Sequence, residues 1–111
     1  MKLAVVGSRG INAIPLEKYI TEEVDEIVSG GAVGVDTCAA DFAKANGLKL
    51  TVFLPEYHIY GRSAPIKRNK QIVDYADAVI AFWDGSSRGT SWVIEYAKQV
   101  NKPCRVLVRK L

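Results

Sequence analysis

Three glycine-containing segments could bind an anion through their backbone, and each follows a hydrophobic run typical of a β-strand. They are Gly-Ser-Arg-Gly at 7–10, Ser-Gly-Gly-Ala-Val-Gly-Val-Asp at 29–36 and Asp-Gly-Ser-Ser-Arg-Gly-Thr at 84–90. In a parallel α/β sheet, the turns that follow strands lie at one edge, where such folds bind their ligands. Glycine lets the backbone approach a ligand and direct N–H groups toward it. We therefore expect one anion-binding crevice, and a nucleotide is the ligand we expect in it.

The second segment combines the glycines of a tight turn with the start of an expected helix. Gly30 and Gly31 allow a sharp bend, and Gly34 allows the helix to begin close to a ligand. The N-terminus of a helix carries about half a positive charge, which suits a phosphate. The alternative is that the glycines only form a strand–helix junction. Asp36 could accept a hydrogen bond from a ribose hydroxyl, or it could complement the helix dipole.

The third segment carries hydroxyl groups just before the last expected helix. Ser87 or Thr90 could cap this helix, which is the purely structural interpretation. With the N–H groups around Gly89, the same hydroxyls could instead form a second nest for an oxyanion. Neither GxGxxG nor GxxxxGK[ST] occurs in the chain, so the residues do not favour dinucleotide binding or P-loop nucleotide hydrolysis.

Three arginines support an anionic ligand. Arg9 and Arg88 lie within glycine segments, and Arg68 lies early in the helix expected after the third strand. All three should reach the same sheet edge, where a guanidinium group can bind a phosphate or carboxylate through two hydrogen bonds. Trp83 could stack on a base there, although packing in the core or in a subunit interface explains it equally well.

The residues with acid–base or metal-binding chemistry form no recognised catalytic or metal motif. Glu56 and Glu95 are carboxylates near the expected edge that could act as a base, whereas His58 is expected to be a loop residue. Neither Cys38 nor Cys104 belongs to a CxxC pair, so a zinc site of the usual spacing is excluded. We expect no metal and no cofactor, and catalytic residues stay unassigned.

The whole chain, residues 1–111, is expected to form one domain. It is 49% hydrophobic with a net charge of +3, which is too small an excess to predict nucleic-acid binding. Strands are expected at Leu3–Val6, Glu26–Val28, Leu48–Leu54, Ala78–Trp83 and Cys104–Val108, helices at Pro15–Val24, Val35–Asn46, Pro65–Tyr75 and Thr90–Val100, and a loop at Pro55–Ser63. This alternation predicts an α/β fold: a Rossmann-like, doubly wound, mainly parallel five-stranded sheet with helices on both faces. With no signal peptide and no apolar run approaching ~20 residues, a soluble cytoplasmic protein is expected.

Four segments form a pattern that covers nearly the whole chain: 5–9 (Val-Val-Gly-Ser-Arg), 29–36, 68–69 (Arg-Asn) and 81–90 (Ala-Phe-Trp-Asp-Gly-Ser-Ser-Arg-Gly-Thr). Together they resemble the SLOG superfamily, which unites the DNA-processing protein DprA with the LOG phosphoribohydrolases, and especially its small single-domain YspA-like branch. The resemblance implies a Rossmann-like sheet that binds nucleotides or their derivatives. Val93 stands where the catalytic glutamate of the LOG motif PGGxGTxxE would lie, so hydrolysis is not transferred to this chain.

By this resemblance, the second segment forms one wall of the site, Gly89 and Thr90 form another, and Arg68 and Asn69 reach in between them. The candidate ligand-binding residues are Gly7, Ser8, Arg9, Gly30, Gly31, Ala32, Gly34, Asp36, Arg68, Asn69, Asp84, Ser87, Gly89 and Thr90. The expected function is binding or sensing of a nucleotide-derived small molecule. Two alternatives are a nucleotide-processing enzyme that cleaves an N-glycosidic bond and a DprA-like module for single-stranded DNA. A homo-oligomer is possible, and no membrane partner is expected.

Overall fold

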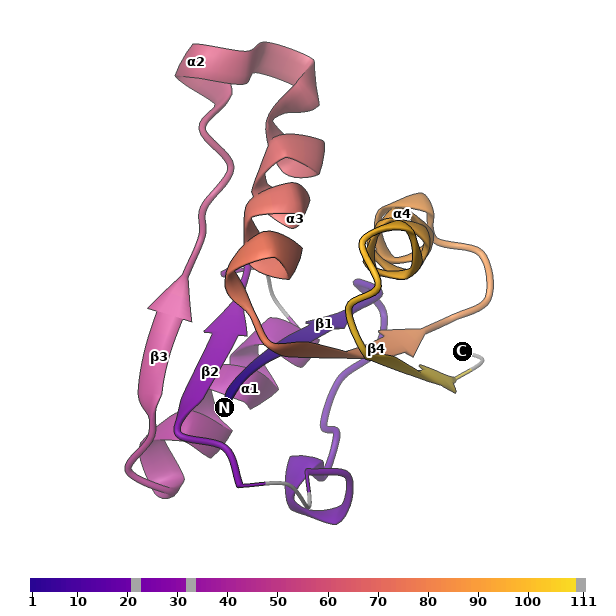
Figure 1. Ribbon diagram of the computed structural model, residues 1–111. Coiled ribbons are helices and arrows are strands. Elements are labelled where there is room, and N and C mark those ends of the chain that lie inside the picture. The colour runs from indigo at the N-terminus through magenta and orange to yellow at the C-terminus, as the bar shows by residue number, and fades with distance from the viewer. Residues whose placement is uncertain (21–22, 32–33, 110–111) are drawn as a thin grey trace.

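The computed structural model describes residues 1–20, 23–31 and 34–109, and within them five parallel strands form one sheet (Figure 1). The strands are β1 (Lys2–Gly7), β2 (Glu26–Ser29), β3 (Lys49–Val52), β4 (Ala78–Trp83) and β5 (Cys104–Val108). The α-helices are α1 (Val35–Ala45), α2 (Tyr57–Tyr60), α3 (Ala64–Tyr75) and α4 (Arg88–Gln99), and the 3₁₀ helices are η1 (Leu16–Lys18) and η2 (Gly61–Ser63). The expected fold class is confirmed, and every strand pairing is parallel.

The two central strands, β1 and β4, are buried along almost their whole length. Their register pairs Leu3 with Ala78 and Val6 with Ala81. Continuous apolar runs of this kind are typical of parallel strands that are covered on both faces. Because β1 and β4 lie side by side, the turns that follow them end next to each other at the carboxyl edge of the sheet.

Helices pack on both faces of the sheet, so the core has two halves. On one face, α1 and η1 cover a cluster built around Val5, Ile27, Val35 and Phe82. On the other face, α3 and α4 cover a second cluster. Its fully buried residues are Ala4, Val28, Ile72, Val73, Ala81, Val93 and Ala97, among others. Burial of these apolar surfaces on both sides holds the sheet between two helical layers.

The order of the strands creates a topological switch point between β1 and β4. The order is β3-β2-β1-β4-β5, so the chain runs outward from β1 through β2 to β3 and then returns to the centre at β4. The connections from β1 and from β4 therefore leave in opposite directions, which opens a crevice at the carboxyl ends of these two strands. This crevice is where the fold can hold a ligand.

The prediction of a helix over Pro15–Val24 is wrong for the described residues. Only the three-residue η1 forms there, with Leu16 buried and Pro15 at its N-terminal end. Tyr19 packs edge-on against Phe82 with ring centroids 5.3 Å apart, and its carbonyl accepts a hydrogen bond from the Arg105 guanidinium. Tertiary contacts thus use the carbonyl that a continued helix would need for its own backbone hydrogen bonds.

Other boundaries also differ from the sequence prediction. The third strand is shorter, Lys49–Val52 rather than Leu48–Leu54. The expected loop at Pro55–Ser63 contains α2 and η2, and the N–H groups of Ile59 and Tyr60 both donate to the Glu56 carbonyl. The last helix begins at Arg88 rather than at Thr90, so the arginine belongs to its first turn. In the described part of the chain, no helix combines the length and apolar character needed to cross a membrane.

Candidate functional site

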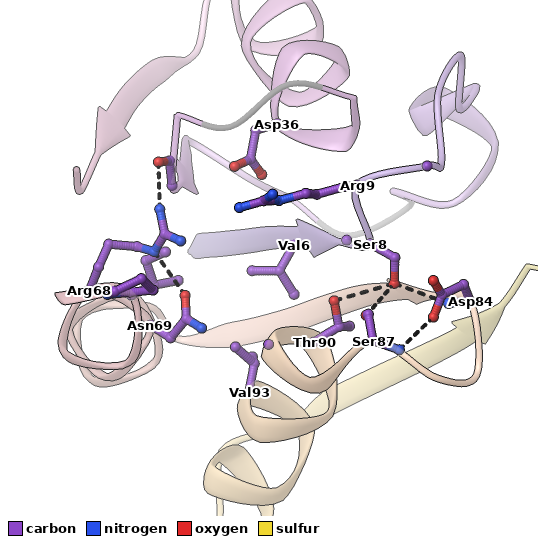
Figure 2. Close-up of a pocket in the computed structure, with 16 residues that line it drawn as sticks. Val6, Ser8, Arg9, Asp36, Arg68, Asn69, Asp84, Ser87, Thr90 and Val93 are labelled. Atoms are coloured by element: carbon purple, nitrogen blue, oxygen red, sulfur yellow. Dashed lines mark hydrogen bonds between the residues drawn. The ribbon is translucent and has the colours of Figure 1, made fainter. Parts of the chain in front are cut away.

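A cavity of about 430 Å³ lies at the switch point, above the carboxyl ends of β1 and β4 (Figure 2). It collects residues from the ends of β1 and β2, from the turn after β4, and from α1, α3 and α4. Its lining residues are Val6, Gly7, Ser8, Arg9, Gly10, Gly30, Asp36, Pro65, Arg68, Asn69, Ile72, Asp84, Ser87, Gly89, Thr90 and Val93. The volume is in the range of small-molecule sites in proteins. The three glycine segments therefore meet in one place, as the sequence predicted.

Arg68, in the first half of α3, is held in one wall of the cavity by two hydrogen bonds. Its Nη1 donates to the Gly30 carbonyl at 2.8 Å, and its Nε donates to Asn69 Oδ1 at 2.8 Å. A Cβ atom added to Gly30 would lie 2.6 Å from Arg68 Nη1. The side chain of Arg68 thus occupies the space where a Cβ atom at position 30 would lie.

Asn69 is oriented by the same arrangement. It is buried, and its Oδ1 is used by Arg68 Nε. Figure 2 shows the amide nitrogen on the opposite side of the group, toward the space between α3 and α4. A primary amide whose oxygen is fixed by one partner presents N–H donors elsewhere. Asn69 can therefore donate to an acceptor atom of a ligand in the cavity.

The charges around Arg68 include both signs. Burial lowers the pKa of Arg68, the charge of the Asp36 carboxylate raises it, and the charge of Arg9 lowers it. A guanidinium group stays protonated in spite of such shifts, so Arg68 remains cationic at neutral pH. Figure 2 shows the side chains of Arg9 and Asp36 facing each other across the upper wall of the cavity. This side thus offers two cations beside a carboxylate that can accept a hydrogen bond.

The opposite side of the cavity is a cluster of hydroxyl groups. Ser8 Oγ lies 2.6 Å from Ser87 Oγ and 3.5 Å from Thr90 Oγ1, and it accepts a hydrogen bond of 3.1 Å from the Asp84 main-chain N–H. Ser8 and Thr90 are both buried. The Ser8 hydroxyl therefore joins the turn after β1 to the turn after β4 and fixes the separation of the two segments.

The nest expected in the 84–90 segment holds a carboxylate of the protein itself. Asp84 Oδ1 accepts hydrogen bonds from the N–H groups of Ser86 at 2.9 Å and Ser87 at 2.7 Å. These bonds, first from Ser86 and then from Ser87, lower the pKa of Asp84. The main-chain donors of this turn are therefore used internally, and Asp84 shapes the turn as an Asx motif.

The N-terminus of α4 keeps donors that face the cavity. Ser87 occupies the N-cap position without a side-chain capping bond. Within the described chain, no hydrogen bond uses the main-chain N–H groups of Gly89 and Thr90, and both residues line the cavity. These groups lie at the positive end of the helix dipole, which favours an anion.

Two glycines expected at the ligand do not line the cavity. A Cβ atom at Gly31 would meet Leu54 Cδ2 at 2.6 Å, and one at Gly34 would meet the Ile11 carbonyl at 2.7 Å. Both have positive φ, so they are needed for tight turns and for close packing between loops. The structural alternative given for the second segment therefore applies to Gly31 and Gly34. Ala32 lies outside the described residues.

Several further side chains proposed from the sequence also lie elsewhere. Arg88 is exposed and is not part of the lining. Trp83 donates from Nε1 to the Ser87 carbonyl at 3.0 Å and so supports the start of α4. Glu95 is exposed and lies 4.0 Å from Lys98. Glu56 and His58 do not line the cavity either. The described residues contain no group of three or more metal-ligating side chains that could hold a metal ion.

The apolar part of the lining is not among the ligand-binding residues predicted from the sequence. Val6, Ile72 and Val93 form it, and Pro65 adds a ring at the start of α3. Figure 2 shows Val6 and Val93 between the Arg68 side and the Ser8 side of the cavity. The positions of Val6 and Ile72, at a strand end and on an apolar helix face, are those of ordinary core residues, so the sequence carries no signal that separates them from the core. Val93, in contrast, stands where the resemblance described above would place the LOG glutamate.

No family model, no curated protein and no solved structure matches the chain, so these comparisons assign it to no family. The function of the cavity therefore has to be inferred from its own residues and geometry.

Proposed function

We propose that this protein binds or senses a nucleotide or a nucleotide-derived ligand in the cavity at the switch point. The observation that carries the proposal is the convergence of donors from three distant segments. Arg9 follows β1, Arg68 lies on α3, and the N–H groups of Gly89 and Thr90 begin α4. Charged and helix-terminal donors of this kind favour a phosphate.

The other parts of the cavity suit the rest of such a ligand. Asp36 can accept hydrogen bonds from sugar hydroxyls, and Asn69 can donate to an acceptor. The apolar lining formed by Val6, Ile72 and Val93 suits the carbon atoms of the sugar. A site with few polar groups placed around an apolar surface is typical of small-molecule binding. Membership of the SLOG superfamily is part of this proposal, and it is the reason for preferring a nucleotide to other anions.

Calorimetry with matched arginine variants tests the proposal. The wild-type protein is titrated with nucleoside monophosphates, nucleotide sugars and dinucleotides, and we expect at least one to bind with micromolar or tighter affinity. Arg68→Ala and Arg9→Ala should each weaken that binding at least tenfold, because each removes a cation at the cavity. Arg88→Ala removes the same charge from an exposed position outside the cavity and should leave the affinity within twofold.

Two results would count against the proposal. One is the absence of heat with every compound in the panel. The other is an equal loss of affinity in Arg88→Ala and Arg68→Ala, since binding would then depend on overall charge rather than on the cavity. Thermal unfolding of each variant confirms that it is folded before titration.

Hydrolysis of the ligand is not proposed. Glu56 and Glu95, the two glutamates considered as a base from the sequence, do not line the cavity. Nucleoside monophosphates are incubated with the protein and separated by chromatography, and we expect no free base. Release of free base would show that the protein hydrolyses the N-glycosidic bond.

A further inference from the structure

Most of the exposed large apolar side chains gather on one part of the molecule. Among the described residues ten such side chains are exposed, and seven of them lie between positions 50 and 66. The other three, Val100, Val106 and Val108, lie just after α4 and on β5. A concentration of exposed apolar surface of this kind is typical of a protein contact. We call the seven residues on β3, on the segment after it, on α2 and at the start of α3 the arm surface: Leu50, Val52, Leu54, Tyr57, Ile59, Tyr60 and Ile66.

The base of the arm surface is β3, which lies at an edge of the sheet. Within the described sheet β3 pairs with β2 alone, so its outer edge has no partner strand. Leu50 and Val52 are two residues apart and therefore lie on the same face of the strand. Val52 and Leu54 lie side by side against Gly31. Edge strands usually carry charges or proline that prevent association, whereas β3 has Lys49 as its one charge and exposes two aliphatic side chains.

The helix at the tip of the arm surface is exposed along its whole length. Figure 1 shows α2 beyond the carboxyl end of β3, at the start of α3. It contains no buried residue, and every residue from 57 to 63 is exposed, with Ile59 at 58%. Helices this short are not stable alone in water, and here the N–H groups of Ile59 and Tyr60 bond the Glu56 carbonyl within the same segment. Packing against another surface would supply the apolar burial that this helix lacks.

We propose that the arm surface is the place where two copies of this chain associate. A two-fold pairing sets one surface against itself, so a surface of low charge suits it. With His58 neutral, the range 49–66 has two cations, Lys49 and Arg62, and one carboxylate, Glu56, so two copies do not repel strongly. The seven residues expose roughly 600 Å² in each copy, close to the ~800 Å² that each partner contributes to a stable interface. Area and charge therefore both fit a second copy, and the inference does not depend on the ligand in the cavity.

Analytical ultracentrifugation of the wild type and three variants tests the proposal. The wild type should sediment as a dimer at micromolar to millimolar concentration. Ile59→Asp and Ile66→Asp each place a carboxylate in the arm surface and should raise the dimer dissociation constant about a hundredfold or more, because an unpaired buried charge is costly. Position 66 is in the first turn of α3, where the helix dipole favours an acidic residue, so this variant should fold. Val108→Asp makes the same change at the opposite edge of the sheet and should leave the dimer intact.

The results that would overturn the proposal are distinct. A wild type that stays monomeric at millimolar concentration would show that the arm surface does not associate with itself. Dimers that persist in both arm variants, or that dissociate equally in Val108→Asp, would place the contact elsewhere. Hydrogen–deuterium exchange of the wild type needs no substitution: the amides of residues 57–63 should exchange more slowly as the protein concentration rises, and those of β5 should not change. Unchanged exchange at 57–63 in a dimeric sample would also reject the arm surface.

Discussion

Replacing Gly30 with alanine should displace Arg68 without altering the fold. Gly30 is buried but does not have a positive φ, so its backbone conformation accepts alanine. The added Cβ would lie 2.6 Å from Arg68 Nη1, 3.0 Å from Cζ and 3.3 Å from Cδ. Since all three atoms belong to one long side chain, the guanidinium group has to move, and the main chain can stay in place.

The size of the effect follows from these distances. An ordinary contact of ~3.5 Å requires a movement of roughly 0.9 Å. The hydrogen bond from Nη1 to the Gly30 carbonyl, now 2.8 Å, would then exceed the usual length limit. Because a flexible side chain moves and the core does not, the cost is mainly that of the lost hydrogen bond, about 0.5–1.5 kcal/mol of unfolding free energy. Misplacement of the guanidinium should also weaken nucleotide binding about tenfold.

A double-mutant cycle measures whether the two residues act together. Urea unfolding and AMP calorimetry are recorded for wild type, Gly30→Ala, Arg68→Ala and the double variant. Because Arg68→Ala removes the atoms that the new methyl group would meet, Gly30→Ala should cost little in that background. The double variant should therefore resemble Arg68→Ala in both measurements. Additive losses of stability and affinity would refute the reasoning, since Gly30 would then act independently of Arg68.

Further predictions concern the opposite side of the cavity. Ser8→Ala removes the hydroxyl that bonds Ser87 Oγ and the Asp84 N–H, and it should lower the unfolding free energy by about 1–3 kcal/mol in urea titrations. The N–H groups of Ser86 and Ser87 lower the pKa of Asp84 from its ordinary 3.8. The stability that this carboxylate contributes is therefore present above pH 3.8 and is lost as the pH falls through the lowered pKa of Asp84 in the folded protein. Unfolding curves of Asp84→Asn should therefore change less than those of wild type on acidification below pH 3.8, and an identical pH dependence would show that the Asp84 bonds do not stabilise the fold. Glu95→Gln should leave AMP affinity unchanged, because the residue is outside the cavity; a clear loss by calorimetry would contradict its placement.

The sequence predicts the sheet and the edge where the site lies because these features depend on local patterns. The continuous apolar run of Ala78–Trp83 is typical of a parallel strand covered on both faces, and it is found as β4 with the predicted bounds. The glycines at 7 and 30 follow strands, so a parallel sheet brings them to one edge. Arg68 could be placed there too, since a helix that follows β3 begins at that edge.

Other features depend on contacts between distant segments and could not be predicted. The helical spacing in 15–24 predicts a helix, but the carbonyl of Tyr19 bonds Arg105, which lies 86 residues away. Gly34 has the same local signature as a ligand-binding glycine, yet its space is taken by the Ile11 carbonyl. Asp84 occupies the donors of its own turn, which the sequence presents as available. For each of these residues, a contact that the local sequence pattern does not show determines its role.

The central claim is that one cavity between Arg68 and the start of α4 binds a nucleotide, and chemical-shift mapping tests it most directly. Two-dimensional amide NMR spectra are recorded during titration with AMP. We predict that the largest shifts are those of the backbone amides of Gly30, Gly89 and Thr90 and the side-chain amide of Asn69. Shifts concentrated at the opposite edge of the sheet, near Asp25 and Asp77, or no shifts at millimolar AMP, would contradict the claim.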